Sequence, residues 1–266
     1  MPQMLIVDAF TAEPFAGNPA AVCFLDSPRP DDWLARVARE MNLSETAFLL
    51  SEGDHWRLRW FTPAVEVALC GHATLASAHA LWQTGRLEPG QSAEFETKSG
   101  RLRALPQGEE IELDFPSTPP TATEPPKGLV DALGLEAPPV WVGRYREDYL
   151  LELASEVEVL RARPDFHALT TTAPTTRGVA ITARAERHGA DFVSRFFAPG
   201  AGVNEDPVTG SAHCALAPYW ADRLGKNPLS AFQASARGGW LKVRVGGERV
   251  YLAGRAVTVV SGELHA

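Results

Sequence analysis

Short apolar runs separated by Gly and Pro shape the first part of the chain. Residues 4–10 (MLIVDAF) and 20–25 (AAVCFL) are rich in strand formers and flank a turn-like segment at 15–19, which predicts a β-hairpin. Strand-like runs recur at 46–50 and 56–61. The pattern of this region therefore favours a sheet.

Two other segments of the same region carry a helical pattern. Apolar residues spaced three and four apart follow Pro30 and predict a helix over about 30–41. Residues 73–82 are rich in Ala and contain no helix breaker before Gly85, which predicts a second helix that is buried.

A proline-rich stretch separates the two halves of the chain. Clustered prolines and the near absence of large apolar side chains are typical of an extended linker, so we expect a first domain at 1–117, a linker at 118–128 and a second domain at 129–253. The elements expected in the second domain are helices at 129–135, 155–161 and 211–224, and strands near Val140 and Tyr149 and at 179–183, 192–198, 241–245 and 249–254.

The second half repeats the order of the first. The sequence RWFTP at 59–63 precedes the first small-residue helix, and RFFAP at 195–199 precedes the second, an offset of 136 residues (199 minus 63). A glycine-containing loop and a helix of small residues follow both segments. The chain is therefore predicted to contain two copies of one α/β unit.

Length and charge narrow the range of partners. A chain of 266 residues with 45% apolar residues can build more than one core, since single cores stop growing near ~250 residues. A net charge of −8 opposes binding to nucleic acid or to an anionic membrane. Because no apolar run approaches the ~18 residues of a membrane span and no signal-peptide pattern is visible, we expect a cytoplasmic protein.

The cysteines and histidines argue against a metal. Cys23, Cys70 and Cys214 are widely spaced and form no CxxC pair, so neither a disulfide framework nor a zinc site is indicated. His72 and His79 are seven residues apart on the expected helix, two turns rather than the single turn that would let them share an ion. Nucleotide-binding glycine motifs are also missing, and we expect neither a metal nor a cofactor.

Each small-residue helix begins after a loop that contains glycine. Residues 70–74 (CGHAT) precede or open the first helix, and residues 206–211 (DPVTGS), including Thr209, precede or open the second. Backbone N–H groups at a helix start attract anions, so both loops are candidates for binding a carboxylate or stabilising an oxyanion. If the halves pack face to face, both loops point into one cleft.

Proton transfer at carbon also needs a general base, and Glu45 is the best candidate. It lies between a predicted helix and an apolar strand, where partial desolvation raises a carboxyl pKa toward the working pH. A solvated surface charge is the alternative for any single glutamate. Ser211 with His213 suggests a hydrolase instead, but GxSxG is absent and residues two apart on a helix point to different sides.

Four segments of this chain resemble the motifs of the PhzF family, the phenazine biosynthesis-like isomerases with the diaminopimelate epimerase fold. They are DAFTAEPFAGNPAAV, MNLSETAFL, FTPAVEVALCGHATLASAHAL and FFAPGAGVNEDPVTGSAHCALAPYW, in the expected order and separation. The resemblance extends to about Gly225 and weakens from Asn227 onward. It implies two similar domains, each a curved sheet wrapped around a central helix, with the last strand (254–266) returning to the first domain.

The resemblance also implies a cofactor-free isomerase that acts on trans-2,3-dihydro-3-hydroxyanthranilate or another small cyclic carboxylate, and it implies a homodimer. Glu45 matches the glutamate that takes a proton from one ring carbon and returns it to another. Gly71 and His72 match the Gly-His pair of the family, with His72 as a substrate ligand or proton partner. Asn18 lies in the hairpin that the resemblance places beside the substrate.

The second loop of the family is matched by Asp206, Gly210 and Ser211. The resemblance assigns Asp206 to positioning the substrate or sharing the proton. It assigns the loop amides to holding a carboxylate.

Two other functions stay open. Epimerases and proline racemases of related fold use two opposed thiols, and Cys70 stands where the first would be, whereas the second loop offers Asp206 and no cysteine. A thiol-assisted epimerase or racemase would therefore need Glu45 or Asp206 as its second base. A non-catalytic ligand-binding relative would keep the loops and exchange no proton.

Overall fold

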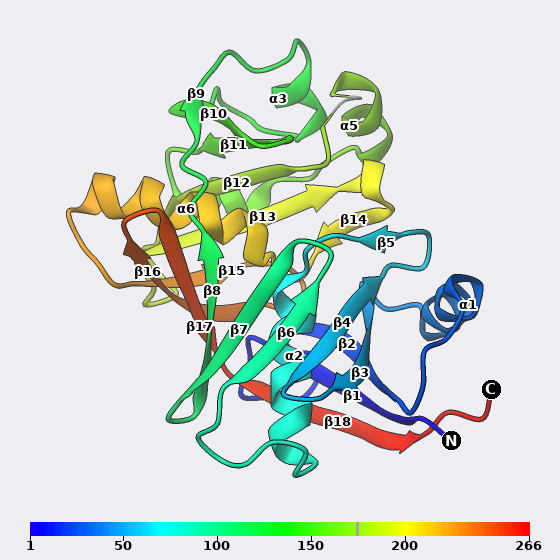
Figure 1. Ribbon diagram of the computed structural model, residues 1–266. Helices are drawn as coiled ribbons and strands as arrows, with labels where there is room; N and C mark the ends of the chain where they lie inside the picture. The colour runs from blue at the N-terminus through cyan, green and yellow to red at the C-terminus, as the bar shows by residue number, and fades with distance from the viewer. Residues whose placement is uncertain (174–175) are drawn as a thin grey trace. The chain divides into compact units, whose positions relative to one another are not determined.

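The computed structural model describes residues 1–173 and 176–266 (Figure 1). The chain divides into two units, one formed by Met1–Phe115 with Tyr251–Ala266 and the other by Pro116–Val250. Each unit combines a mixed sheet with a long helix of small residues. The predicted α/β fold class is confirmed.

The sheet of the first unit pairs its strands in the order β18, β1, β2, β3, β4, β6, β7 and β8, with the short β5 against β4. The pairs β2–β3 and β4–β6 are parallel, and the others are antiparallel. The bounds of the strands are β1 (Gln3–Ala9), β2 (Asn18–Leu25), β3 (Glu45–Glu52), β4 (His55–Phe61), β5 (Glu66–Val67), β6 (Ala93–Thr97), β7 (Gly100–Gln107), β8 (Glu110–Pro116) and β18 (Ala256–Glu263).

Two helices pack on this sheet in different ways. The helix α1 (Asp31–Met41) is amphipathic and buries Leu34 and Val37 in a cluster with Phe48. In contrast, α2 (Gly71–Gln83) is buried along most of its length and contacts β1, β2, β3, β7 and β18. Its alanines let the strands approach closely on several sides, which is the expected arrangement of a curved sheet around a central helix.

The second unit has the same plan. Its strands are β9 (Thr121–Ala122), β10 (Trp141–Tyr145), β11 (Asp148–Glu152), β12 (Val179–Arg184), β13 (Phe192–Ala198), β14 (Val203–Asp206), β15 (Leu229–Gln233) and β16 (Gly239–Gly246), and β17 (Arg249–Gly254) leads back to the first unit. Its helices are α3 (Leu129–Ala132), α4 (Glu156–Arg161), α5 (Phe166–Thr172), the short η1 (Pro199–Ala201) and α6 (Gly210–Leu224). The segment expected as a linker contains β9, which pairs with β10.

The central helix of the second unit is α6, and its side chains reach several strands. The Trp220 ring stacks on Phe192 of β13, and its Nε1 donates a hydrogen bond to Thr182 of β12 at 2.9 Å. The hydroxyl of Tyr219 donates to Glu152 of β11 at 2.6 Å. Among the helices of residues 1–173 and 176–266, none has both the length and the apolar character needed to cross a membrane.

Strand register shows that the sequence repeat is a repeat of structure. In the first unit Thr46 pairs with Phe61 across β3 and β4, and in the second Val179 pairs with Phe197 across β12 and β13. Phe197 follows Phe61 by the same offset that separates the two proline-containing segments. The strand pairs on both sides also alternate between parallel and antiparallel in the same order.

The loop before β2 fixes where that strand begins. Gly17 has φ +62°, and a Cβ on it would lie 2.2 Å from the carbonyl oxygen of Ala9, so only glycine fits. Phe15 also has a positive φ, and its N–H donates to the buried carboxylate of Asp8 at 2.7 Å. As a result Asn18, predicted to lie in the turn, is instead the fully buried first residue of β2.

Candidate active site

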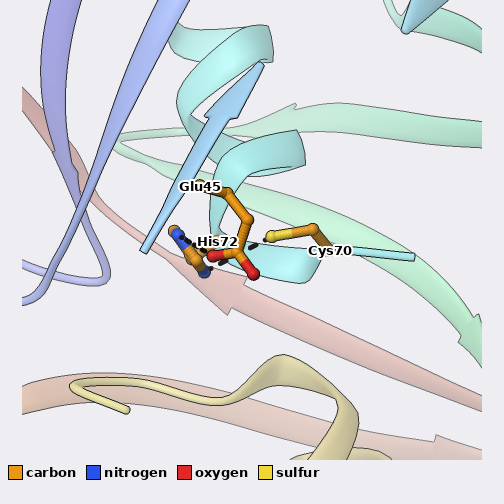
Figure 2. A group of neighbouring side chains, drawn as sticks. All are labelled: Glu45, Cys70 and His72. Atoms are coloured by element: carbon orange, nitrogen blue, oxygen red, sulfur yellow. Dashed lines mark hydrogen bonds and ion pairs between the residues drawn. The ribbon is translucent and has the colours of Figure 1, made fainter. Parts of the chain in front are cut away.

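Polar side chains at the starts of β2, β3 and α2 meet inside the first unit. Glu45 is the first residue of β3, His72 is the second residue of α2, and Cys70 precedes that helix. Figure 2 shows these three side chains pointing toward one another. Glu45 Oε2 lies 3.3 Å from His72 Nε2, and Cys70 Sγ lies 3.5 Å from His72 Nδ1. Gly71, the first residue of the helix, lies between Cys70 and His72 in the chain.

The His72 imidazole is neutral. Burial lowers the pKa of His72 to about 3, because an imidazolium in this position would lose its hydration. Although His72 and Glu45 are within ion-pair distance, the His72 ring in this contact is uncharged at neutral pH. This contact is therefore not a salt bridge.

Asn18 determines which nitrogen of His72 carries the proton. The amide Nδ2 of Asn18 can only donate, and it lies 3.1 Å from His72 Nδ1, which must accept. The proton of the neutral ring is therefore on Nε2, the nitrogen that faces Glu45. Within the described part of the chain no well-directed hydrogen bond reaches Nε2, and a ligand oxygen could provide one.

Glu45 is partly buried, with 17% of its side chain exposed against 4% for His72. Its backbone is held by parallel pairing with Ala20 of β2. The carboxylate is thus fixed at a strand start, close to a neutral hydrogen-bond donor and still reachable by solvent or by a small molecule.

Glu45, Cys70 and His72 also form a set of possible metal ligands, since each offers a donor atom within 4.8 Å of the others. Carboxylate, thiolate and imidazole are all ligands of Zn²⁺. However, Cys70 approaches Nδ1 of the ring and Glu45 approaches Nε2, and an ion binds only one of these nitrogens. The observed arrangement suits hydrogen bonding to the ring better than a single shared ion.

The second loop is organised by Gln233, the buried last residue of β15. Its Oε1 accepts a hydrogen bond from the Thr209 N–H at 2.8 Å, and its Nε2 donates to the Asp206 carbonyl at 2.7 Å. The Thr209 hydroxyl donates to the Asp206 carboxylate at 2.5 Å. Two hydrogen bonds from the Gln233 side chain therefore hold the main chain of this turn, an arrangement that we call the Gln233 clamp. The Thr209 amide already donates to Gln233.

Ser211, the second residue of α6, contacts an ion pair whose carboxylate is buried and whose guanidinium is partly exposed. Its Oγ accepts a hydrogen bond from Arg177 Nη2 at 2.9 Å. Arg177 binds Asp148 through both its Nε, at 3.1 Å, and its Nη2. Burial raises the pKa of Asp148, an effect that the Arg177 guanidinium opposes.

Both central helices start without a side-chain cap in the described part of the chain. The first hydrogen bonds of the helices are made by Thr74 N–H in α2 and His213 N–H in α6. Preceding amides, including those of Gly71 and Gly210, are at the positive end of a helix dipole, where an anion is favoured.

The hydrolase alternative has no geometric support. His213 Nδ1 bonds the Thr209 carbonyl at 2.8 Å, so this nitrogen donates to the backbone and not to Ser211. Burial also lowers the pKa of His213 to about 4. The side chain is fully buried and serves the core of the second unit.

The structure thus gathers the predicted site residues into two groups, one in each unit. Glu45, His72, Gly71 and Asn18 belong to the first group; Asp206, Thr209, Gly210 and Ser211 belong to the second. Three residues were missed from sequence: Gln233, Arg177 and Asp148. Gln233 ends a strand whose other buried residues, Leu229 and Ala231, are apolar, and this was a usable signal for it. No sequence pattern marked Arg177 or Asp148.

Comparison with known proteins finds relatives that match nearly the whole chain. The family described as phenazine biosynthesis-like protein (PhzC-PhzF) matches residues 7–262. A protein of Halalkalibacterium halodurans named an uncharacterized isomerase is 53% identical over 260 residues, which cover 97% of each chain. The crystal structure of a PhzF family protein from Enterococcus faecalis gives a TM-score of 0.93 at 40% identity, covering 100% of this chain and 99% of that one.

The fold extends beyond close relatives. The structure of a predicted epimerase from Pseudomonas aeruginosa has a TM-score of 0.81 at 23% identity over the full length of both chains, and the expected diaminopimelate epimerase-like fold is confirmed. With a family match over nearly the whole chain and a relative at 53% identity, this protein belongs to the PhzC-PhzF family of phenazine biosynthesis-like proteins.

Proposed function

We propose that this protein is a cofactor-independent isomerase of the PhzF type, with Glu45 as the general base. The substrate would be a small cyclic carboxylate such as trans-2,3-dihydro-3-hydroxyanthranilate or an analogue. The observation that carries the proposal is the partly buried Glu45 carboxylate beside a neutral His72, 3.3 Å from the nitrogen that bears the ring proton. The family membership and the isomerase names of relatives support it.

In this proposal the Glu45 carboxylate removes a proton from one ring carbon and returns it to another. No other atom is gained or lost, so the reaction is balanced without a co-reactant. A base held at a strand start needs little reorganisation, and positioned proton transfer typically contributes 10²- to 10⁴-fold to a rate. Because 17% of the Glu45 side chain is exposed, a proton held there can exchange with solvent before it is returned.

Neutral His72 has the role of a hydrogen-bond donor. A ring whose pKa is lowered to about 3 holds no second proton to give near neutral pH. It can direct its Nε2 proton toward a substrate oxygen as well as toward Glu45. Of the two roles considered for His72, substrate ligand is therefore favoured over proton partner.

The second loop is proposed to bind the substrate carboxylate. The amides at the start of α6 and the hydroxyl of Ser211 are hydrogen-bond donors, and Asp206 is proposed to position the substrate or share the proton. Thr209 contributes by holding the turn, because its amide and hydroxyl already bond Gln233 and Asp206. The homodimer expected from the resemblance is part of the proposal, and sedimentation velocity would test it.

The thiol-assisted alternative lacks a second cysteine with the required properties. Burial raises the pKa of both Cys23 and Cys214 to about 12, so these thiols stay protonated at neutral pH. Cys70 contacts His72 Nδ1 and could at most act with a carboxylate as the other base. Exchange that survives alkylation of Cys70 would remove this alternative.

Proton exchange into a substrate tests the proposal. We would incubate the protein, with EDTA present, in D₂O with trans-2,3-dihydro-3-hydroxyanthranilate and a panel of amino and hydroxy acids, and read deuterium by mass spectrometry. Exchange at a ring carbon of a cyclic carboxylate is expected. Exchange only at the α-carbon of an amino acid would favour the epimerase reaction, and no exchange with any compound would favour a non-catalytic relative.

A further inference from the structure

An ion pair between the buried Asp148 and the more exposed Arg177 contacts the start of α6. Asp148 is 1% exposed and takes two hydrogen bonds from the guanidinium of Arg177. The same guanidinium lies over the ring of Phe196, 5.1 Å from its centroid. Its Nη2 also donates to Ser211 Oγ at 2.9 Å. Arg177 is thus held by a carboxylate and a ring while it reaches the second residue of the helix.

This contact decides where the hydroxyl proton of Ser211 can go. A guanidinium has donors and no acceptor, so Ser211 Oγ must be the acceptor in this bond. The Ser211 proton is then free to be donated only in another direction. With Arg177 in place, the Ser211 hydroxyl is biased toward donating. A donor at the positive end of the α6 dipole suits an anion rather than a neutral group.

The first unit contains a similar contact with opposite charge, displaced by one residue in the repeat. Thr46 and Val179 occupy the same place in the repeat, because they pair with Phe61 and Phe197 respectively. Glu45 immediately precedes Thr46 and reaches the second residue of α2, while Arg177, two residues before Val179, reaches the second residue of α6. The repeat thus places an acid at one helix start and a cation at the other.

We propose that Arg177 is a positioning residue that acts through Ser211 to make the start of α6 selective for a carboxylate. Asp148 keeps the guanidinium in place and balances its charge, so the selectivity comes from the direction of the Ser211 hydroxyl. This inference rests on the proposed function of the second loop, which it deepens. It is separable from the role of Glu45, because it concerns binding and not proton transfer.

Binding of benzoate, compared with the neutral isostere benzamide, tests the proposal without turnover. The ¹⁵N-labelled protein is titrated with each compound while the amide signals of Gly210 and Ser211 are followed by NMR. Wild-type protein is expected to bind benzoate more tightly than benzamide, with shifts at both amides. Arg177→Met and Ser211→Ala should each reduce that preference by about tenfold, the value of one lost hydrogen bond to a charged group.

A double-mutant cycle distinguishes positioning from general structural support. If Arg177 acts through Ser211, adding Arg177→Met to Ser211→Ala should reduce benzoate affinity little further. The matched control is Arg223→Met, which removes an arginine that pairs with Glu152 and stacks on Tyr219, near the other end of α6. That control should leave the benzoate preference unchanged.

The single variant Arg177→Met leaves Asp148 buried without its partner, so the double variant Asp148→Asn/Arg177→Met is measured beside it, with thermal unfolding of each. Unchanged benzoate preference in the folded Arg177 variants, additive effects in the cycle, or no benzoate binding by wild-type protein would each overturn the proposal. Benzoate binding that depends on Arg177 and Ser211 in a protein that exchanges no substrate proton would instead count against the isomerase function alone.

Discussion

The amide of Asn18 lies 3.1 Å from Nδ1 of His72, and both side chains are buried. This single contact sets the tautomer of the ring, because the amide nitrogen can only donate and Nδ1 must accept. The remaining ring proton is then on Nε2, next to Glu45. A residue at the start of one strand thereby determines which hydrogen bond the proposed site can offer.

Asn18→Asp should reverse this arrangement. A carboxylate at position 18 accepts a proton from Nδ1 and favours the imidazolium, so the pKa of His72 should rise above its wild-type value of about 3. Imidazole ¹⁵N shifts followed against pH would show both the new tautomer and the higher pKa, and exchange of a substrate proton should slow by at least about tenfold. The control is Asn42→Asp, at the end of α1. A His72 ring that titrates identically in both variants would contradict the assignment.

Gln233→Glu tests the clamp on the second loop. The variant keeps an oxygen for the Thr209 N–H but loses the amide donor to the Asp206 carbonyl. We expect a loss of about 1–3 kcal/mol in the free energy of unfolding, together with faster hydrogen exchange at the Thr209 amide. Gln107→Glu, on the exposed end of β7, should cost little by comparison. An equal loss in the free energy of unfolding for Gln233→Glu and Gln107→Glu, measured with urea, would show that the hydrogen bonds of Gln233 do not stabilise the loop.

Gly17→Ala should be far more costly than Gly53→Ala. Both glycines have positive φ, +62° and +74°, so both alanines carry the same kind of backbone strain. Only at Gly17 would the added Cβ also meet backbone, 2.2 Å from the Ala9 carbonyl oxygen, whereas Gly53 has open space around it. Gly53→Ala is expected to cost about 1 kcal/mol and Gly17→Ala at least about 2 kcal/mol more. Similar unfolding midpoints for the two variants would disprove this account of the β1–β2 loop.

Acid should destabilise the protein partly through His213. Burial lowers its pKa from 6.5 to about 4 in the folded state, so between these values the unfolded chain binds more protons. Stability from this group is complete above about pH 6.5 and is lost as pH falls toward 4, at up to about 1.4 kcal/mol per pH unit. Between pH 6.5 and 4.5 the free energy of unfolding should therefore fall by about 2 kcal/mol less in His213→Gln than in wild-type protein, as measured by urea unfolding. An equal fall in the free energy of unfolding of wild-type protein and His213→Gln over this pH range would contradict the expectation.

Much of the fold was accessible from sequence because its strongest signals are local. The alanine-rich segment before Gly85 predicted α2. The similarity of RFFAP at 195–199 to RWFTP at 59–63 predicted the repeat and the position of α6. The strands between 93 and 116 were not assigned, although the alternation of Ile111, Leu113 and Phe115 with acidic residues was a usable signal.

The site was only partly accessible for a physical reason. Glu45 and His72 could be singled out one at a time, but their contact depends on β3 and α2 meeting in the folded unit. Asn18 was assigned to a turn because Gly and Pro flank it, and its burial follows from the conformation that Gly17 imposes. Arg177 and Asp148 pair across 29 positions of sequence, and nothing near either residue indicates the partner.

The most direct test of the account is the rate of deuterium exchange into a cyclic carboxylate substrate by Glu45→Gln, compared with Glu52→Gln at the other end of β3. The amide keeps the size of the side chain and its contact with His72 but cannot accept the substrate proton. We predict that Glu45→Gln lowers the exchange rate by at least about a hundredfold with substrate affinity and thermal stability nearly unchanged, while Glu52→Gln exchanges like wild type. Exchange at the wild-type rate by folded Glu45→Gln would contradict the assignment of Glu45 as the base.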